Sequence, residues 1–599
     1  SLRKLGGVPL LTGLLSGFQR LRSMGKMCDV VLEVGDVSFP CHRALLASSS
    51  DYFWALFGES TAESRASTIC LLALTPQGLE AILDFLYSGW LSLSHSTIPD
   101  VLEAARYLQV DPAVSICQQF MTDGLNTENC CSYANLAERH GLSDAFEAAN
   151  QTIARVMRNL LRESRDDLLN LNIQSLLAVF DTDEIPGVKE VELIKLALDW
   201  LEANGPLPLL KSNLLLSHLR FGLVTTSDLT TLSKSHCAMT SPLIRSQVTR
   251  ALEYHRLGSA QPINQSKQST LRASPNRVLL VGAGFSAEGP EQQLLTFDPR
   301  IRKFSPLGCT LPLRLRNSCL CSLGGFLFVL GGEEMENENE EPKKSVSVAT
   351  SNQVWRYDPR FDCWEQGESM LESRAQFTCC VVEDLIYIVG GQNTNPITAE
   401  RTSVASVEFY DIATGKWRKG PTMPRPLYGH AATVLDNSVY VSGGVSDNPR
   451  RASMSIARFS HRLAAAHGYI YSLLGKYEPF CDIERYDSES DHWTRLKPLF
   501  TGSFNYGMVP TASGNLLLFG GTRWNDGQQV NVKSVLEYDT KKDCWKEIGQ
   551  LPRPLTGIEC TLLPLVKKVS STLRLQNRLF SILWGFKRLN SALKTHYCF

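Results

Sequence analysis

The sequence predicts a multidomain α+β chain: a small α/β module, then an all-helical stretch, then an all-β propeller of six blades. Three observations predict this order. Apolar residues in the first part of the chain recur at helical spacing, interrupted by a few short strand-like runs. A short stretch rich in Gln and Ser follows. In the remaining part an aromatic hairpin and a glycine pair recur about every 50 residues, a period typical of propeller repeats.

The first module is predicted from residues 10–123. An amphipathic helix comes first, because Leu14, Leu15, Phe18 and Leu21 share one helical face. The elements expected after it are strands at 28–34 and 37–41, helices near 42–47 and 50–53, a strand at 69–71, and helices at 79–87 and 101–110. Apolar clusters at helical spacing then predict only helices over 124–258. Residues 259–275 carry few bulky apolar side chains and are interpreted as a linker.

The propeller is predicted over 276–565. Most copies have a Tyr-Asp pair and a Trp seven positions after the Tyr, with an apolar run and a glycine pair upstream. Gly282-Ala283-Gly284 and the lone Gly475 look like decayed versions of that pair. The aromatic pairs are Tyr357/Trp364, Tyr410/Trp417, Tyr486/Trp493, Tyr538/Trp545 and a weaker Phe297/Phe304. We expect the aromatics to fill the space between neighbouring sheets, and the glycines to allow positive φ and close approach of another chain. These residues therefore build the scaffold and do no chemistry.

Two copies are irregular at the ends of the array. The first begins at Arg277 without a preceding strand, whereas a spare strand, 557–565, follows Trp545. We expect this last strand to complete the first blade, which closes the ring and removes exposed sheet edges. The fourth copy is short: Gly444 and Gly475 are 31 positions apart with no Tyr-Asp…Trp hairpin between them. About two strands of the fourth blade should be missing, leaving exposed edges and reduced local stability.

Two charged segments lie outside this pattern. Residues 333–341 carry six glutamates and are expected to form a solvated insertion, with an acidic docking patch as the alternative. The tail, 566–599, is basic and has apolar residues on one helical face. It could associate with an anionic membrane surface or a partner, although a poorly packed extension is the more ordinary interpretation.

Composition limits the function. With 43% hydrophobic and 20% charged residues and a net charge of −1, the chain is globular and no bulk field favours nucleic acid. No apolar run is long enough to cross a membrane. Seventeen cysteines without zinc spacing suggest reduced thiols and a cytoplasmic location, with the nucleus as an alternative. We find no catalytic constellation and expect no catalytic residues, metal or cofactor. Cys319, Cys379 and Cys380 could be redox sensors, but their apolar strand contexts favour inert core thiols.

Several motifs resemble a known family. They are Asp29-Val30 with Phe39, the run 42–47, Ser50-Asp51-Tyr52-Phe53, the run 85–89 and Ala104-Ala105. Together they resemble a BTB domain, with Asp29 expected to pair with the basic site at His42 and Arg43. Asn129-Cys130, Ala137, Glu190, Ala197, Trp200 and 219–221 stand where a BACK domain has its pattern. With the repeats, residues 10–565 resemble a kelch-like protein: BTB, BACK and kelch propeller.

The resemblance implies a function carried by surfaces. It implies a substrate-recognition adaptor of a cullin-3 RING E3 ubiquitin ligase, non-catalytic, that pairs as a homodimer through Leu14, Leu15, Phe18 and Leu21. Cullin-3 would bind around Phe53, Leu56, Phe57, Thr61 and Glu63. Thr61 stands where relatives often have an apolar residue, and the smaller area to bury would cost roughly 1 kcal/mol of affinity.

The propeller would bind an unknown substrate protein. In the family an arginine often begins the strand after the Trp, and here Arg316, Arg374, Arg425 and Arg458 are the candidates. Binding substrate and hydrogen bonding between blades are equally open roles for them. The alternative function is a non-ligase scaffold that binds cytoskeletal or other protein partners. An enzyme with a pocket in the propeller is a third and remote hypothesis.

Overall fold

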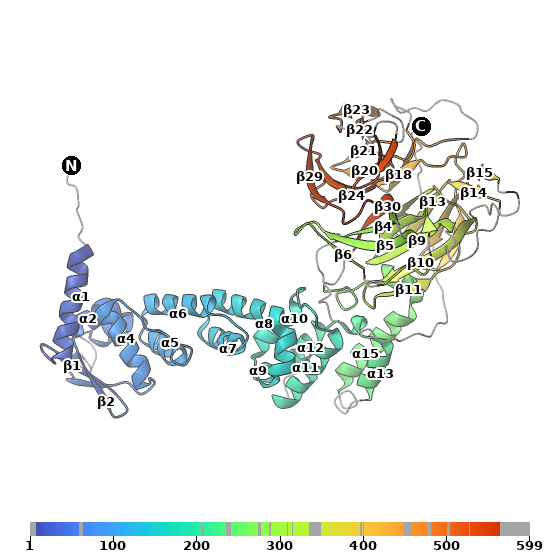
Figure 1. Cartoon of the computed structure of the whole chain (residues 1–599). Helices are drawn as coiled ribbons and strands as arrows, with labels where there is room; N and C mark the ends of the chain where they lie inside the picture. The colour runs from blue at the N-terminus through green and yellow to red at the C-terminus, as the bar shows by residue number, and fades with distance from the viewer. Residues whose placement is uncertain are drawn as a thin grey trace, which may run out of the picture. The chain divides into compact units, whose positions relative to one another are not determined.

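The computed structural model describes residues 8–58, 64–205, 209–234, 241–272, 277–286, 289–307, 309–313, 315–334, 349–395, 398, 400–446, 458–475, 481–499, 503–525 and 528–563. The chain divides into two units at Leu219 and Arg220, and each unit is described by itself. Figure 1 shows the chain and labels many of their helices and strands. The fourth-copy residues 447–457, most of the acidic insertion and the basic tail lie outside the described residues.

The first unit begins with a small α/β module. Its elements are α1 (Val8–Ser23), β1 (Val30–Val34), β2 (Val37–Cys41), α2 (Arg43–Ser49), α3 (Asp51–Leu56), β3 (Thr68–Cys70), α4 (Pro76–Ser88), α5 (Ile98–Tyr107) and α6 (Asp111–Asp123). β1 lies in the middle of the sheet, antiparallel to β2 and parallel to β3. Local chemistry sets the helix ends: Thr75 caps α4 by accepting the Gly78 N–H, and Gly89 ends it with a φ of 78°.

Only helices follow in this unit. They are α7 (Cys130–His140), α8 (Ser143–Glu163), α9 (Arg165–Leu169), α10 (Ile173–Asp181), α11 (Glu190–Ala203) and α12 (Leu209–Ser217). The apolar core of the α/β module continues into α7 and α8 through Tyr133, Ala137 and Ala145. Burial at every third or fourth position is the pattern that the sequence predicts for this stretch.

The second unit contains the end of the predicted helical stretch together with the propeller. Its helical elements are η2 (Phe221–Leu223), α13 (Thr226–Ser233), α15 (Pro242–Arg256) and η3 (Gly258–Ile263). Residues 220–258 therefore belong to the same compact unit as the propeller, although the sequence pattern grouped them with the preceding helices.

In the described residues six sheets form the blades of the propeller, and two further two-stranded sheets accompany blades 3 and 6. Blade 1 has β30 (Thr556–Leu563), β4 (Arg277–Ser286), β5 (Gly289–Asp298) and β6 (Lys303–Pro306). Blade 2 has β7 (Leu315–Arg316), β8 (Cys319–Leu323), β9 (Phe326–Glu334), β10 (Thr350–Asp358) and β11 (Cys363–Gln366). Blade 3 has β12 (Thr378–Val382), β13 (Leu385–Val389), β16 (Val407–Asp411) and β17 (Lys416–Lys419), with the outlying hairpin β14 (Gln392–Thr394) and β15 (Arg401–Ser403).

The remaining blades complete the ring. Blade 4 has only β18 (Ala431–Leu435) and β19 (Ser438–Ser442) among the described residues. Blade 5 has β20 (Arg462–Ala466), β21 (Tyr469–Leu473), β22 (Ile483–Asp487) and β23 (His492–Leu496). Blade 6 has β24 (Gly507–Pro510), β25 (Leu516–Phe519), β28 (Ser534–Asp539) and β29 (Cys544–Gln550), with the hairpin β26 (Thr522–Asn525) and β27 (Gln528–Asn531).

Closure of the ring follows the prediction. The C-terminal strand β30 pairs antiparallel with β4, placing Cys560 opposite Leu280, so the two lie side by side in Figure 1. The innermost strand of each blade contacts the innermost strand of the next. Their order around the ring is β30, β8, β12, β18, β20, β24 and back to β30. The short fourth blade still supplies its inner strand, so the inner ring is unbroken.

The repeated aromatics and glycines do what their spacing predicts. Tyr357 and Trp364 are a cross-strand pair with ring centroids 5.1 Å apart, and the Tyr357 hydroxyl donates to Asp362 at 2.9 Å. Gly390 has a φ of +58°, and a Cβ there would lie 2.7 Å from the Leu427 carbonyl oxygen of the next blade. A side chain would therefore push neighbouring blades apart.

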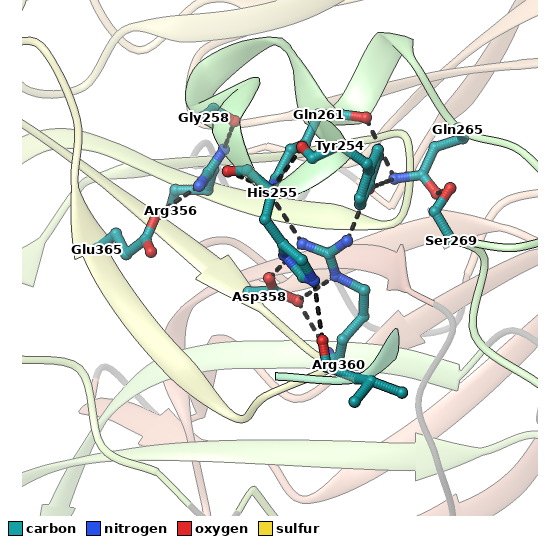
Figure 2. A network of polar contacts seen from close by, with 11 residues as sticks. Tyr254, His255, Gly258, Gln261, Gln265, Ser269, Arg356, Asp358, Arg360 and Glu365 are labelled. Atoms are coloured by element: carbon teal, nitrogen blue, oxygen red, sulfur yellow. Dashed lines mark hydrogen bonds and ion pairs between the residues drawn. The ribbon is translucent and has the colours of Figure 1, made fainter. Parts of the chain in front are cut away.

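The segment expected to be a linker is folded against blade 2. η3 packs so closely that a Cβ on Gly324 would lie 2.0 Å from the Pro262 carbonyl oxygen. Figure 2 shows the polar contacts there: Arg360 donates to the Tyr254 hydroxyl at 2.6 Å and to Gln261 Oε1 at 3.0 Å. Arg356 donates to the Gly258 carbonyl at 2.7 Å. The composition of residues 259–275 suggested a linker. It could not reveal these contacts, because their partners in blade 2 are distant in sequence.

Candidate protein-binding surfaces

The first candidate surface is the outer face of α1. Leu14 is 51% exposed, and Leu15, Phe18 and Leu21 are half-buried. Phe18 packs edge-on against His42 at 5.4 Å and so anchors the helix to the module. A helix with one anchored face and a large exposed apolar residue on another suits pairing with a second protein surface.

The second surface is α3. Ser50 caps this helix by accepting the Phe53 N–H at 3.2 Å. Phe53 is 0% exposed and stacks on Phe57 at 5.7 Å, so it points into the core. Phe53 therefore cannot contact a partner, which corrects the sequence-based expectation. Leu56 and Phe57 are half-buried at the core's edge. Thr61 and Glu63 lie outside the described residues.

Sequence reasoning missed Trp54. Its side chain is 70% exposed on the outer side of α3, next in sequence to the buried Phe53. Tyr52 lies on the same helix and packs on Tyr107 of α5, with ring centroids 5.1 Å apart. Helical periodicity could have found Trp54, because Phe53 and Phe57 share one face and a residue one position on turns away by about 100°. An exposed tryptophan is a strong interface candidate because it has a large area to bury.

The polar residues near α2 have a structural role. Asp29 Oδ1 accepts the backbone N–H of Arg43 at 2.8 Å, at the start of α2. His42 is buried, and its Nδ1 lies 2.8 Å from the Tyr87 hydroxyl. These contacts hold α2 against α4.

Two of the four propeller arginines lie inside blades. Arg374 is 0% exposed and forms an ion pair with Glu408, which is also buried. Arg458 is 3% exposed, and its Nη2 donates to Glu484 at 3.1 Å. Both also donate to backbone carbonyls, for example Arg374 to Gly390 at 2.9 Å. Of the two open roles, hydrogen bonding within the propeller is the one that fits, and these two side chains cannot reach a substrate.

The other two arginines are more accessible. The side chain of Arg316 is 43% exposed and donates to the buried carboxylate of Glu333 at 2.6 Å. Arg401 reaches the same carboxylate at 3.5 Å. Arg425 is half-buried in the segment before β18. Arg316 and Arg425 therefore remain candidates for contact with a substrate.

The three cysteines considered as redox sensors are poorly placed for reaction. Burial raises the pKa of Cys380 to about 12. A hydrogen bond with Cys379, together with burial, raises the pKa of Cys319 well above its usual value. Thiolates are the reactive form, so these cysteines fit the inert alternative. Within the described ranges we find no disulfide, no metal-binding group of three or more His, Cys, Asp or Glu, and no helix long and apolar enough to span a membrane.

Comparison with known proteins agrees with this arrangement. Residues 18–125 match the BTB/POZ domain, and residues 130–234 match the domain described as BTB And C-terminal Kelch. Residues 317–549 match the KLHDC2/KLHL20/DRC7 Kelch-repeats domain. An α/β module with an exposed aromatic helix, followed by helices and a propeller, defines a class of modular protein-binding adaptors.

Relatives cover nearly the whole chain. Human Kelch-like protein 34 is 37% identical, over 92% of this chain and 95% of its own length. Bovine Kelch-like protein 36 is 30% identical over 91% of each chain, and zebrafish Kelch-like protein 26 is 27% identical over 94% of each. The chain belongs to the kelch-like protein family. This architecture supports a substrate-adaptor role, and proteins of this kind are typically non-catalytic.

Proposed function

We propose that this chain is the substrate-recognition subunit of a cullin-3 RING E3 ubiquitin ligase. In this proposal α1 mediates homodimerisation, the outer face of α3 binds cullin-3, and the propeller binds the substrate protein. The observation that carries the proposal is Trp54, 70% exposed on a helix whose inner face is locked by the fully buried Phe53. A rigid helix that displays a tryptophan loses little side-chain freedom on binding. We further propose that it acts in the cytoplasm, with a nuclear pool as the alternative.

The cullin step is tested with the purified full-length chain and the N-terminal domain of cullin-3, by calorimetry. We expect micromolar or tighter binding, and a loss of tenfold or more for Trp54→Ala because central aromatic contacts typically contribute about 2 kcal/mol or more. Trp90→Ala is the matched control, since Trp90 is 82% exposed in the same unit but follows α4. Absence of binding by the unmodified chain at about 10 μM would favour the scaffold function over the ligase.

The dimer step has a separate readout. We expect Leu14→Asp to shift the chain from dimer to monomer in light scattering, because a carboxylate cannot be buried in an apolar interface without a large cost. Gln19→Asp, at an exposed position of the same helix, controls for added charge. A wild-type chain that is already monomeric at micromolar concentration would contradict this part of the proposal.

A further inference from the structure

Blade 4 leaves one edge of β19 open. In blade 3 the equivalent strand β13 pairs with β12 on one side and β16 on the other. β19 pairs only with β18, and no other strand in the described ranges lies against it. Among the described residues, the backbone N–H and C=O groups of Ser438–Ser442 on that side have no strand partner. An open strand edge is a template for adding another strand.

The space beside this edge is lined by apolar side chains that are incompletely covered. The cluster between blades 4 and 5 has three buried members in the described residues, whereas the other five clusters within the propeller have between eight and thirteen. Tyr440, Leu463 and Trp493 in that cluster are only half-buried. The described residues contain no outer strands in blade 4 like those that cover such residues in complete blades, so a peptide could bury them.

Each of the two walls of this space carries an arginine with an exposed side chain. On the blade 3 side, Arg418 lies opposite Phe409 in the strand register, and Phe409 packs toward blade 4. The Arg418 side chain is 44% exposed and lies 3.5 Å from Asp411. On the blade 5 side, the exposed Arg495 is two positions after Trp493 and so shares its face. Acidic side chains in an added strand would meet a cation on either face.

The complete blades show which sequence suits this position. The strand that pairs with β13 is Val407–Asp411, and its counterpart in blade 5 is Ile483–Asp487. Both have an apolar residue first, a glutamate second, and a Tyr-Asp pair at the end. These segments pair antiparallel over five and four residues, respectively.

We propose that the open edge of β19 binds an extended acidic segment of a partner protein, which adds to blade 4 as a third strand. The segment places an aromatic ring opposite Tyr440, as Phe409 lies opposite Tyr387 in blade 3, so that this ring faces Trp493. It pairs its carboxylates with Arg418 and Arg495. This inference rests on the proposed adaptor function only in taking the bound partner to be the substrate. The test measures peptide binding to the propeller, so a negative result differs from a failure of the first unit to bind cullin-3.

The test is fluorescence anisotropy with the full-length chain. The probe is a labelled peptide that copies residues 405–412, Ala-Ser-Val-Glu-Phe-Tyr-Asp-Ile. We expect saturable micromolar binding that weakens with added salt, because the cationic walls are exposed. A peptide with Gln and Asn in place of its acids should bind at least about fivefold more weakly. Two further peptides are N-methylated at alternate residues, one at the odd and one at the even positions. If binding uses backbone pairing, the peptide whose pairing N–H groups are methylated should lose binding and the other should keep it. Nonspecific apolar contact would leave both peptides with similar affinity.

Protein variants locate the site. Arg495→Glu should weaken binding about fivefold or more, and Arg418→Glu should do the same. The matched control is Lys419→Glu, an exposed residue beside Arg418 whose side chain points to the other face of the strand. Unfolding temperatures within about 2 °C of wild type confirm that each variant is folded. Equal affinities for Arg495→Glu, Lys419→Glu and wild type would overturn the proposal, as would no binding of the peptide at 1 mM.

Other occupants give different results. If the peptide binds only after residues 564–599 are deleted, the chain's own C-terminal segment fills the edge and the partner proposal is wrong. If Arg495→Glu lowers the oligomeric state of the full-length chain in light scattering, a second copy occupies the edge, which also overturns it. Binding by the intact chain with an unchanged oligomeric state supports an external segment.

Discussion

Arg360 connects the folded segment after α15 to the second blade, and its replacement gives the sharpest test of the structure. Its guanidinium donates to Asp358 at 2.6 and 2.9 Å, to the Tyr254 hydroxyl and to Gln261 (Figure 2). The side chains of Arg360 and Asp358 are only 4% and 6% exposed. The guanidinium also lies 4.6 Å from the centre of the Phe326 ring.

The magnitude follows from burial. Arg360→Met keeps much of the apolar stem but leaves the Asp358 carboxylate buried without its cation. Breaking one side of a buried ion pair typically costs about 3–5 kcal/mol. We therefore expect the free energy of unfolding of the second unit to fall by about 3–5 kcal/mol. Asp358→Asn in the same chain should recover part of this loss, since it removes the uncompensated charge.

The chain provides a matched control in Arg300. It occupies the same Asp-Pro-Arg turn in blade 1, with its N–H donating to Asp298 at 3.0 Å, but its side chain is exposed. We expect Arg300→Met to change stability by less than about 0.5 kcal/mol. The assays are urea unfolding and hydrogen exchange. Exchange of backbone amides at 254–265 should accelerate in Arg360→Met alone. Equal stability and exchange in the two variants would refute the assigned role of Arg360.

Further predictions concern the propeller's interior. Burial lowers the pKa of His430 to about 4 and that of His461 to about 3, so the fold holds both neutral. Because each unfolded imidazole binds a proton near pH 6.5, this contribution to stability should be present above that pH and fall by about 3 kcal/mol in total between pH 6.5 and 5. Replacing both with Gln should flatten this dependence in calorimetry, whereas replacing the exposed His467 should not; an equally steep profile in the double variant would contradict the assignment. Gly390→Ala should destabilise the propeller by about 2–4 kcal/mol, from its positive φ and the close carbonyl, measured by urea unfolding. Gly549→Ala should be nearly neutral because its Cβ would meet nothing within 4 Å, and equal losses at the two sites would refute the steric argument.

Features that depend on local spacing were predictable. The seven-residue interval between Tyr357 and Trp364 corresponds to one hairpin, so sequence alone placed them as neighbours. The first copy lacks a strand before Arg277, and a spare strand follows the last copy. Together these two irregularities predicted that β30 pairs with β4. The 31-residue interval before Gly475 predicted a fourth blade with two strands fewer, as the described residues show.

The candidate site was less predictable because orientation and burial come from the whole fold. Phe53 and Trp54 are adjacent aromatics on a helix of six residues, and the spacing of Phe53 and Phe57 separates their faces without showing how far each side chain is covered. Packing against the core buries Phe53 and leaves Trp54 exposed. Arg374 and Arg316 likewise have similar places in the repeat, yet one is buried and the other is 43% exposed.

The sequence by itself determined the order of the parts, the repeat and the closure of the ring, because each follows from periodic apolar residues and turn residues close together in the chain. Only the tertiary structure decided which side chains are accessible, and that the segment after α15 is folded. Arg360 is 99 residues from Gln261, and sequence spacing carries no information about a contact made across that distance.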